Sequence, residues 1–510
     1  MEQSNNHTIA RNTLTLYGRS VLMMLIGLYT SRVILQTLGV TDFGIYNAVG
    51  GIVAMFGFIS GSLGNATSRF ITVAIGKGDM DLTVKTFGNV KVIYYLLSVL
   101  IVLLGETIGL WFLYHEMSIP ADRMQAAFWV YQYSILASVT AFVSVPYNSA
   151  IIAHERMSAF AYISLLDAVL KLLVCYLLLV VPYDKLVTYA SLLFAIEIVD
   201  RIIYVVYCSK RFEEVCARPR ICREQFRSIL AMSGWTISGN LVWILNTQGV
   251  NIVLNVFFGP VVNAARGIAM QVQGVMGQFV TNFQTAVNPQ ITKSYAQGNY
   301  ARMGELLQMS SRYSYLLMFT MSLPVCIEAP VILRWWLGTV PDYTVVFLRL
   351  VLVSAVVASL SNPLWISVLA TGRLKKYMLC DNTVQFLVLP VTYAVFKWMG
   401  GSPAWAFAII AISACIGLYV RVWLVLPLIR YSYREYIKKV IAPLVCVTLI
   451  SPIFPLLLYG YISSPLINFL LVTLTSLICC GVTIWFLAMY NPERAMIRQK
   501  LYNMLTKQHM

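Results

Sequence analysis

The chain has few charged residues and many long stretches with none. Of its 510 residues only 11% are charged, whereas 59% are hydrophobic, and its mean hydropathy is +0.74. Soluble domains contain about 25% charged and 45 to 50% apolar residues, so the composition excludes an ordinary soluble domain. Continuous apolar runs, rather than alternating ones, favour helices over a barrel. The sequence therefore predicts an all-α polytopic membrane protein.

Several chemical signatures are missing as well. The ten cysteines and four histidines have no metal-ligand spacing, so neither a metal site nor a disulfide framework is expected. No GxxxxGK[ST] loop is present, which argues against ATP hydrolysis within the chain. The polar start MEQSNNHTIARN leads straight into a full-length apolar span, without a cleavable signal pattern. No cofactor and no catalytic residue is predicted, and the chain is not expected to be an enzyme.

Apolar segments long enough to cross about 30 Å of hydrocarbon recur along the whole chain. About fourteen transmembrane helices are predicted, near residues 13–38, 43–72, 89–114, 125–152, 159–181, 186–208, 229–257, 261–289, 312–337, 343–371, 377–398, 404–429, 440–461 and 465–489. Most Lys and Arg residues outside the helices fall at the termini and in the loops after even-numbered helices, which predicts that both termini are cytoplasmic. The net charge of +16 is then a topogenic signal, and no nucleic-acid binding is expected.

An internal repeat is visible when the chain is shifted against itself by 220 positions without a gap. Gly39 then meets Gly259, Gly78 meets Gly298, and the following Asp79 meets an asparagine. Helices 1 and 2 thus correspond to helices 7 and 8, which predicts two parallel, pseudo-symmetric six-helix bundles. The predicted domains are an N-terminal bundle at 1–228 (helices 1 to 6), a C-terminal bundle at 229–430 (helices 7 to 12), and 431–510, which adds helices 13 and 14 and a cytoplasmic tail.

The duplicated helices contain arginines but almost no acids. The arginines are Arg19, Arg32, Arg69 and Arg266; the only acid between residues 3 and 78 is Asp42, in a predicted loop, and residues 225 to 304 contain none. An arginine at the bilayer centre costs at least about 2.5 to 3.5 kcal/mol. Unpaired arginines therefore predict a hydrated cavity that binds an anion. The alternative is that an arginine side chain snorkels to the lipid headgroups. We expect this of Arg349 and Arg421, which lie near helix ends without a strip of polar residues.

Amide side chains follow the same helices in strips at helical spacing. With the arginines they make up the predicted substrate-binding cavity: Asn65 on helix 2, Asn240, Asn251 and Asn255 on helix 7, and Gln273 and Gln284 on helix 8. The alternative is that these amides only join helices, because interhelical hydrogen bonds between amides stabilise membrane bundles by about 0.6 to 2 kcal/mol each.

Helices 5 and 6 carry charges of both signs. Asp167 with Lys171, and Glu197 with Arg201, have the acid-then-base i, i+4 spacing that forms an ion pair within a helix, and Asp200 lies beside the second pair. Both predicted pairs should lie at similar depth in neighbouring antiparallel helices. Such a network is either structural or, if protons drive the cycle, a site of ion coupling.

The stretch SRVILQTLGVTDFGIYNAVGGIVAMFGFISGSLGNATSRFI, followed by IGKGD, resembles the start of bacterial polysaccharide-repeat-unit (O-antigen-type) flippases. These belong to a superfamily that also contains multidrug extruders and the peptidoglycan lipid-precursor flippase. The specific part of the resemblance covers about residues 12 to 80, and the topology extends it to helices 1 to 12. It implies two bundles that open alternately to either side, and a cationic cavity matched here by Arg32, Arg69 and Arg266.

The resemblance also implies a substrate and a pathway. We expect the chain to flip polyprenyl-pyrophosphate-linked oligosaccharides from the inner to the outer leaflet of the bacterial inner membrane, for surface polysaccharide or lipopolysaccharide biosynthesis. Its expected partners are the membrane, this lipid-linked oligosaccharide with its anionic head, and proteins of polysaccharide assembly. One alternative is a cation-coupled multidrug exporter of the same fold, which would place acids in the cavity. Another is a membrane enzyme of polysaccharide assembly, which would need reactive residues on a substantial outer loop.

Overall fold

The structure is a computed structural model of the chain. It describes residues 2–54, 63–64, 67, 70–71, 74–75, 78–154, 156–216, 226, 241–242, 244–460, 464–491 and 493–495. These residues form α-helices, short 3-10 and π-helical turns and connecting loops, with no strand among them. The predicted all-α class is therefore confirmed.

Eight helices in the described part of the chain are long and apolar enough to cross a membrane, and a bent pair adds a ninth if it is counted as one span. That pair is α12 (Tyr300–Ile327) with α13 (Ala329–Leu337), which meet at 79°. The long helices α1 (Glu2–Ala54), α7 (Lys185–Arg211) and α11 (Pro260–Ala296) are not among the eight. The total of fourteen stays a prediction, because predicted spans overlap residues 55–62 and 227–240, outside the described residues.

The chain packs into two compact units. The first contains Met1–Ile268 and Leu389–Pro403, and the second contains Ala269–Val388 and Ala404–Met510. The division between them falls inside two continuous helices, α11 and α16 (Leu374–Ala394). Residues 244–268, which the sequence analysis assigns to the C-terminal bundle, pack within the first unit; the bundle boundaries at 228 and 430 stay a prediction.

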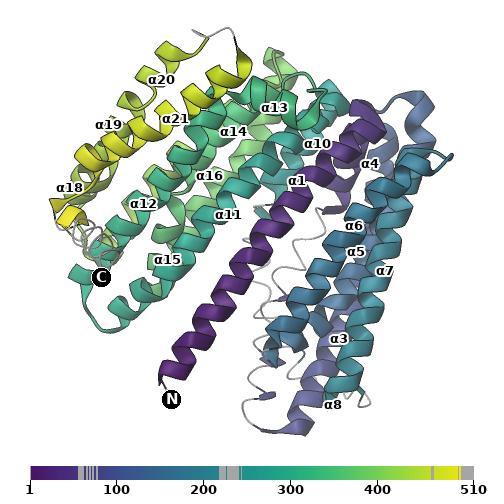
Figure 1. The fold of residues 1–510 in the computed structure, drawn as a ribbon. Coiled ribbons are helices and arrows are strands. Elements are labelled where there is room, and N and C mark those ends of the chain that lie inside the picture. The colour runs from purple at the N-terminus through teal and green to yellow at the C-terminus, as the bar shows by residue number, and fades with distance from the viewer. Residues whose placement is uncertain are drawn as a thin grey trace, which may run out of the picture. The chain divides into compact units, whose positions relative to one another are not determined.

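The first unit is built around four helices that run side by side in Figure 1: α3 (Met80–Leu104), α5 (Met124–Ala153), α6 (Met157–Val180) and α7. An apolar core joins α5 and α7 to the last part of α1, and it contains Ile45, Val130 and Leu186, all fully buried. Shorter elements complete the unit: η2 (Gly105–Gly109), α4 (Leu110–His115), η3 (Ala121–Arg123), α8 (Glu213–Cys216), η4 (Leu245–Gly249), α10 (Val250–Phe258) and η5 (Val395–Met399).

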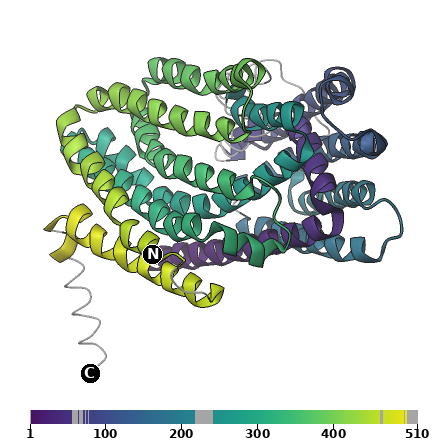
Figure 2. The same ribbon diagram turned by 90° about the horizontal axis from the view of Figure 1, so that it is seen from above.

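In the second unit, α12 packs against α14 (Thr344–Ala358), which packs in turn on α17 (Ala404–Leu428). The C-terminal helices, yellow in Figure 2, lie along one edge of this unit. Tyr315 on α12 holds them there through a hydroxyl pair with Thr448 on α19 (Ala442–Ile450) at 2.8 Å, while Ser451, just after α19, pairs with Thr483 at the end of α21 (Pro465–Thr483) at 2.7 Å. The remaining elements are α15 (Ser361–Thr371), α18 (Tyr433–Tyr436), η6 (Ile437–Ile441), α20 (Ile453–Leu458) and η7 (Ile484–Ala488).

The backbone repeats itself at the glycines that the 220-position shift aligns. Gly39 has φ 80° and ψ 171°, and Gly259 has φ 79° and ψ −177°, a region that only glycine enters readily. Gly78 and Gly298 also match, with φ 68° and 70°. The residues that follow them, Asp79 and Asn299, each cap a helix. The side-chain Oδ1 of each accepts a hydrogen bond from the backbone N–H three residues further on, at 3.0 Å in both copies. The two copies therefore turn the chain in the same way.

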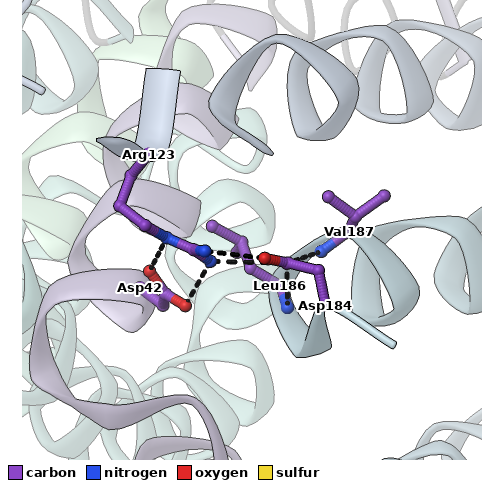
Figure 3. Close-up of polar contacts among 5 residues, drawn as sticks. All are labelled: Asp42, Arg123, Asp184, Leu186 and Val187. Atoms are coloured by element: carbon purple, nitrogen blue, oxygen red, sulfur yellow. Dashed lines mark hydrogen bonds and ion pairs between the residues drawn. The ribbon is translucent and has the colours of Figure 1, made fainter. Parts of the chain in front are cut away.

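Three charged side chains clamp one end of the first unit (Figure 3). Arg123, just before α5, donates from Nε to Asp42 at 2.9 Å and from Nη1 to Asp184 at 2.6 Å. Asp184 also caps α7 by accepting from the N–H groups of Leu186 and Val187. Burial opposes ionisation of Asp184, but the bonds from Arg123 and these N–H groups outweigh it, so the pKa of Asp184 is lowered. The loop predicted at Asp42 is not formed, because this residue lies within α1, just after the bend at Gly39, and the clamp joins that bend to the starts of α5 and α7.

Candidate functional site

Arg266 is a buried arginine without an acid partner. Only 7% of the residue is exposed, and its Nη2 donates to the carbonyl oxygen of Thr247 at 2.5 Å. Thr247 lies in η4, a π-helical turn, and such turns are frequent at functional sites. The Arg266 Nε has no hydrogen-bond partner. Among the described residues no Asp or Glu forms an ion pair with this guanidinium.

Arg32 is the other arginine of the set whose side chain the structure describes. It is half-buried on the first part of α1, and it too forms no ion pair with a carboxylate in the described part of the chain. The side chain of Arg19 and all of Arg69, Asn65 and Asn240 lie outside the described residues. Arg32 and Arg266 thus keep a charge that no acid among the described residues neutralises, and their contact with a substrate stays a prediction.

Asn251 and Asn255 take part in a chain of buried hydrogen bonds. Asn251 Nδ2 donates to the carbonyl oxygen of Asn47 at 3.0 Å, and Asn263 Nδ2 donates to Asn251 Oδ1 at 2.8 Å. Asn255 Nδ2 donates to Asn263 Oδ1 at 2.9 Å, while its own Oδ1 accepts from the N–H of Ser118 at 3.1 Å. These bonds form an amide network that joins α1, α10 and α11. Asn251 and Asn255 therefore join helices through hydrogen bonds, as the alternative to substrate binding predicts. Their role in substrate binding stays a prediction.

Glycines allow the helices of this network to approach each other closely. A Cβ atom on Gly51 would lie 2.6 Å from Asn251 Nδ2, and one on Gly267 would lie 3.0 Å from Asn47 Oδ1. Both distances are shorter than ordinary van der Waals contact, so larger residues would displace the amides. Asn47 and Asn263 complete the network, although the predicted set of site residues omits them. The sequence does indicate Asn263, because it lies three residues before Arg266 at the start of α11.

The two glutamines of α11 lie in the second unit and differ in their surroundings. Gln284 is 4% exposed, and its Nε2 donates to Ser314 Oγ and to the carbonyl oxygen of Ser359, both at 3.0 Å. It therefore joins α11 to α12 and to the end of α14. Gln273 is half-buried. The amide of Gln284 is occupied within the unit, and substrate binding by either residue stays a prediction.

Charged residues of α6 and α7 line one cavity, so these members of the two predicted pairs do lie near each other. A cavity of about 320 Å³ between α5, α6 and α7 is lined by Asp167, Lys171, Glu197 and Asp200, among others. Lys171 Nζ lies 2.7 Å from Asp167 Oδ1, which confirms the first predicted ion pair. The second is not formed: no ion pair joins Glu197 to Arg201 in the described structure, because Glu197 faces the cavity, whose lining does not include Arg201.

The snorkelling predicted for Arg421 is wrong. This residue is 9% exposed, and its Nε lies 2.7 Å from Asp381 Oδ1, while Nη2 donates to Asp381 Oδ2 at 3.1 Å. The guanidinium also contacts Ser361 Oγ. This bidentate pair joins α17 to α16, so the charge of Arg421 is neutralised within the second unit. Arg349 instead donates from Nε to the carbonyl oxygen of Cys326 at 2.8 Å, at the end of α12.

Known proteins resemble this chain in structure. No protein-family model matches the sequence, and a search of curated proteins found no match. Among solved structures, the lipid II flippase MurJ in an inward closed conformation is 12% identical, with a TM-score of 0.69 over 91% of this chain and 96% of that chain. An inward-facing multidrug resistance MATE family transporter of the MOP superfamily is 14% identical, with a TM-score of 0.63 over 82% and 99%.

A further match is the MATE multidrug transporter DinF-BH, at 16% identity and a TM-score of 0.57 over 82% of this chain and 97% of that chain. At such identities the likeness concerns the fold. The chain has the multi-pass helical fold that these membrane transporters share.

Proposed function

We propose that the chain is a flippase that moves polyprenyl-pyrophosphate-linked oligosaccharides from the inner to the outer leaflet of the bacterial inner membrane by alternating access, for surface polysaccharide or lipopolysaccharide biosynthesis. In this role it needs no cofactor and makes or breaks no covalent bond. The proposal is supported by the fold, which resembles that of a lipid II flippase, and by the sequence resemblance of its first helices to polysaccharide flippases.

The observation that carries the proposal is the state of Arg266. Its guanidinium remains charged at any physiological pH, yet it is buried against one backbone carbonyl, with Nε unpartnered. A buried charge of this kind is stabilised most by a charge-assisted bond to an anionic oxygen. A pyrophosphate supplies several such oxygens in the geometry that a guanidinium fork accepts. Arg32, which has no acid partner in the part of the chain that the structure describes, supplies a second charge in the same unit.

The direction of transport follows from electrostatics. A head group of charge about −2 that moves outward through a membrane negative inside gains roughly 4.6 kcal/mol per 100 mV. The fixed charges of the protein return with the empty carrier, so they do not oppose the net transfer. The membrane potential therefore favours export of the lipid-linked sugar even without ATP.

A cellular assay with charge-specific variants tests the proposal. Cells depleted of the protein should accumulate lipid-linked oligosaccharide on the inner leaflet, and wild type should restore export. Arg266→Gln should bind a polyprenyl pyrophosphate about 10- to 150-fold more weakly, because it removes charge-assisted hydrogen bonds that contribute about 1.5 to 3 kcal/mol. Arg266→Lys keeps the charge and should lose less.

Arg349→Gln is the matched control, because Arg349, on α14, also donates to a backbone carbonyl, that of Cys326 at the end of α12, but is not among the candidate residues. Its loss should leave export unchanged. Full export by Arg266→Gln and Arg32→Gln, at normal amounts of folded protein, would refute anion binding by these residues. Export of organic cations instead of lipid-linked sugar by wild type would favour the multidrug exporter of the same fold.

A further inference from the structure

The cavity between α5, α6 and α7 contains more negative charge than its own base can neutralise. Three carboxylates line it, those of Asp167, Glu197 and Asp200, with one ammonium, that of Lys171. Lys171 Nζ lies 2.7 and 2.9 Å from the two carboxylate oxygens of Asp167, so its charge is engaged there. Glu197 and Asp200 form no ion pair within the described part of the chain. The cavity therefore favours an additional positive ion.

Asp200 is the clearest case of a buried carboxylate that has no positively charged partner among the described residues. It is 9% exposed, it lines the cavity, and its Oδ1 has no hydrogen-bond partner. Asp167 lines the same cavity, where the two carboxyl groups lie close enough to interact electrostatically. Two ionised carboxylates only accept hydrogen bonds and repel each other at such a distance, whereas a protonated one donates its O–H to the other. The proximity of Asp167 and Asp200 in the cavity is therefore favourable when the pair shares a proton.

The remaining groups around this acid pair are few. They are Lys171 and Ser164 on α6, Glu197 and Tyr204 on α7, Ser144 and Asn148 on α5 and, near Glu197, Tyr46 on α1. The hydroxyl groups of Ser144 and Ser164 donate to carbonyl oxygens of their own helices, at 2.7 Å each, so they offer the pair no proton. Lys171 is the one base in the lining of this cavity, and its positive charge opposes protonation of the pair.

A proton suits this cavity better than a metal ion. Within the residues that the structure describes, no group of three or more His, Cys, Asp or Glu side chains is arranged to hold a metal. The Lys171 ammonium already binds the Asp167 carboxylate and repels any second cation that approaches it. A proton avoids this repulsion, because it converts one carboxylate into a neutral acid.

We propose that Asp167 and Asp200 bind a single exchangeable proton in this cavity, with Lys171 as a fixed counter-cation, so that the chain takes protons rather than alkali-metal ions as its coupling ion. When the O–H bond of the acid breaks, the proton passes to water and the electron pair stays on the carboxylate. Two adjacent carboxylates then repel across α6 and α7, and this repulsion favours a different packing of the two helices. The coupling to export rests on the proposed function, whereas proton binding does not.

Infrared difference spectroscopy of the purified full chain in lipid nanodiscs tests the site directly. The carbonyl-stretch band of a protonated carboxylic acid should appear as the pH falls, and it should be lost in Asp200→Asn and in Asp167→Asn. Asp122→Asn, an exposed acid outside the cavity, is the matched control and should leave the band unchanged. Lys171→Met removes the counter-cation, so it should move the band to higher pH, with about 10- to 1,000-fold tighter proton binding.

Thermal unfolding of each variant establishes that it is folded. If Asp200→Asn does not fold, Asp200→Glu is the second variant, and it should retain the band because it keeps an acid. An unchanged band in both asparagine variants would overturn the proposal. Saturable binding of radioactive sodium by wild type that disappears in these variants would overturn it too. If the band behaves as expected but wild type moves no lipid-linked sugar under a pH gradient, the proposed function fails while the proton site stands.

Discussion

Gly50 and Gly51 are neighbours in α1, and together they offer a controlled test of the amide network. A Cβ on Gly51 would lie 2.6 Å from Asn251 Nδ2, whereas one on Gly50 would meet no atom within 4 Å. Ordinary contact begins at 3.4 Å, so Gly51→Ala requires the Asn251 amide to shift by 0.8 Å. That amide is held by Asn47 and Asn263 through bonds of 3.0 and 2.8 Å. The shift therefore breaks at least one buried hydrogen bond.

The size of the effect follows from a comparison of the two variants. Each glycine lies within a helix, so alanine at either position raises helix propensity by the same amount, about 0.5 to 1 kcal/mol, which cancels between them. Gly51→Ala additionally loses about 1 to 3 kcal/mol through overpacking or an unsatisfied amide. We expect it to unfold roughly 2 to 10 °C below Gly50→Ala, if the cooperative unit is about 200 residues.

Thermal unfolding of the detergent-purified proteins, followed by intrinsic fluorescence and by size-exclusion chromatography, measures this difference. In the background of Asn251→Ala, where the clashing amide is absent, Gly51→Ala should lose most of its effect. Equal melting temperatures for the two single glycine variants would show that Asn251 does not pack on Gly51, and the amide network would then be wrong.

Three further predictions concern the clamp, the ion pair of the second unit and the repeated glycines. Asp184→Asn should destabilise by about 0.5 to 1 kcal/mol at pH 7. This effect should diminish in thermal unfolding as the pH falls below 3.8, because the pKa of Asp184 is lowered from that value on folding and its contribution is lost as the pH falls through the lowered value; a constant effect would contradict it. Arg421→Met should cost about 3 to 5 kcal/mol by leaving Asp381 buried and unpaired, and Asp381→Leu added to it should recover much of the loss; additive losses would disprove the pair. Gly39→Ala and Gly259→Ala should each lower stability by about 1 to 3 kcal/mol through backbone strain, and a neutral result at either position would contradict the shared conformation.

Local patterns in the sequence were good guides to local structure. The helical class follows from continuous apolar runs, and the glycine corners follow from the repeat, because φ near 80° is a property of a residue and its two neighbours. The pair of Asp167 and Lys171 was predictable for the same reason, because residues four apart on a helix lie on the same face and close enough to pair.

Contacts between distant segments were not predictable in the same way. Asp381 lies 40 positions from Arg421, and nothing in either apolar segment indicates that α16 and α17 present these charges to each other. The i, i+4 rule also fails where a competing environment exists, since Glu197 turns into the cavity instead of toward Arg201. Tertiary packing decides such cases, and a single sequence does not show which distant residues pack together.

The four left-handed glycines at positions 39, 78, 259 and 298 have a consequence for how diverged relatives can be aligned. Nearly every substitution at these corners adds a Cβ that the backbone there does not tolerate, whereas the apolar side chains between them can be exchanged for one another with little loss. As related sequences diverge, the similarity of the helical segments should therefore be lost long before these four glycines are replaced. Glycines at fixed spacing, rather than overall identity, are then the marks by which to register one half of such a chain on the other.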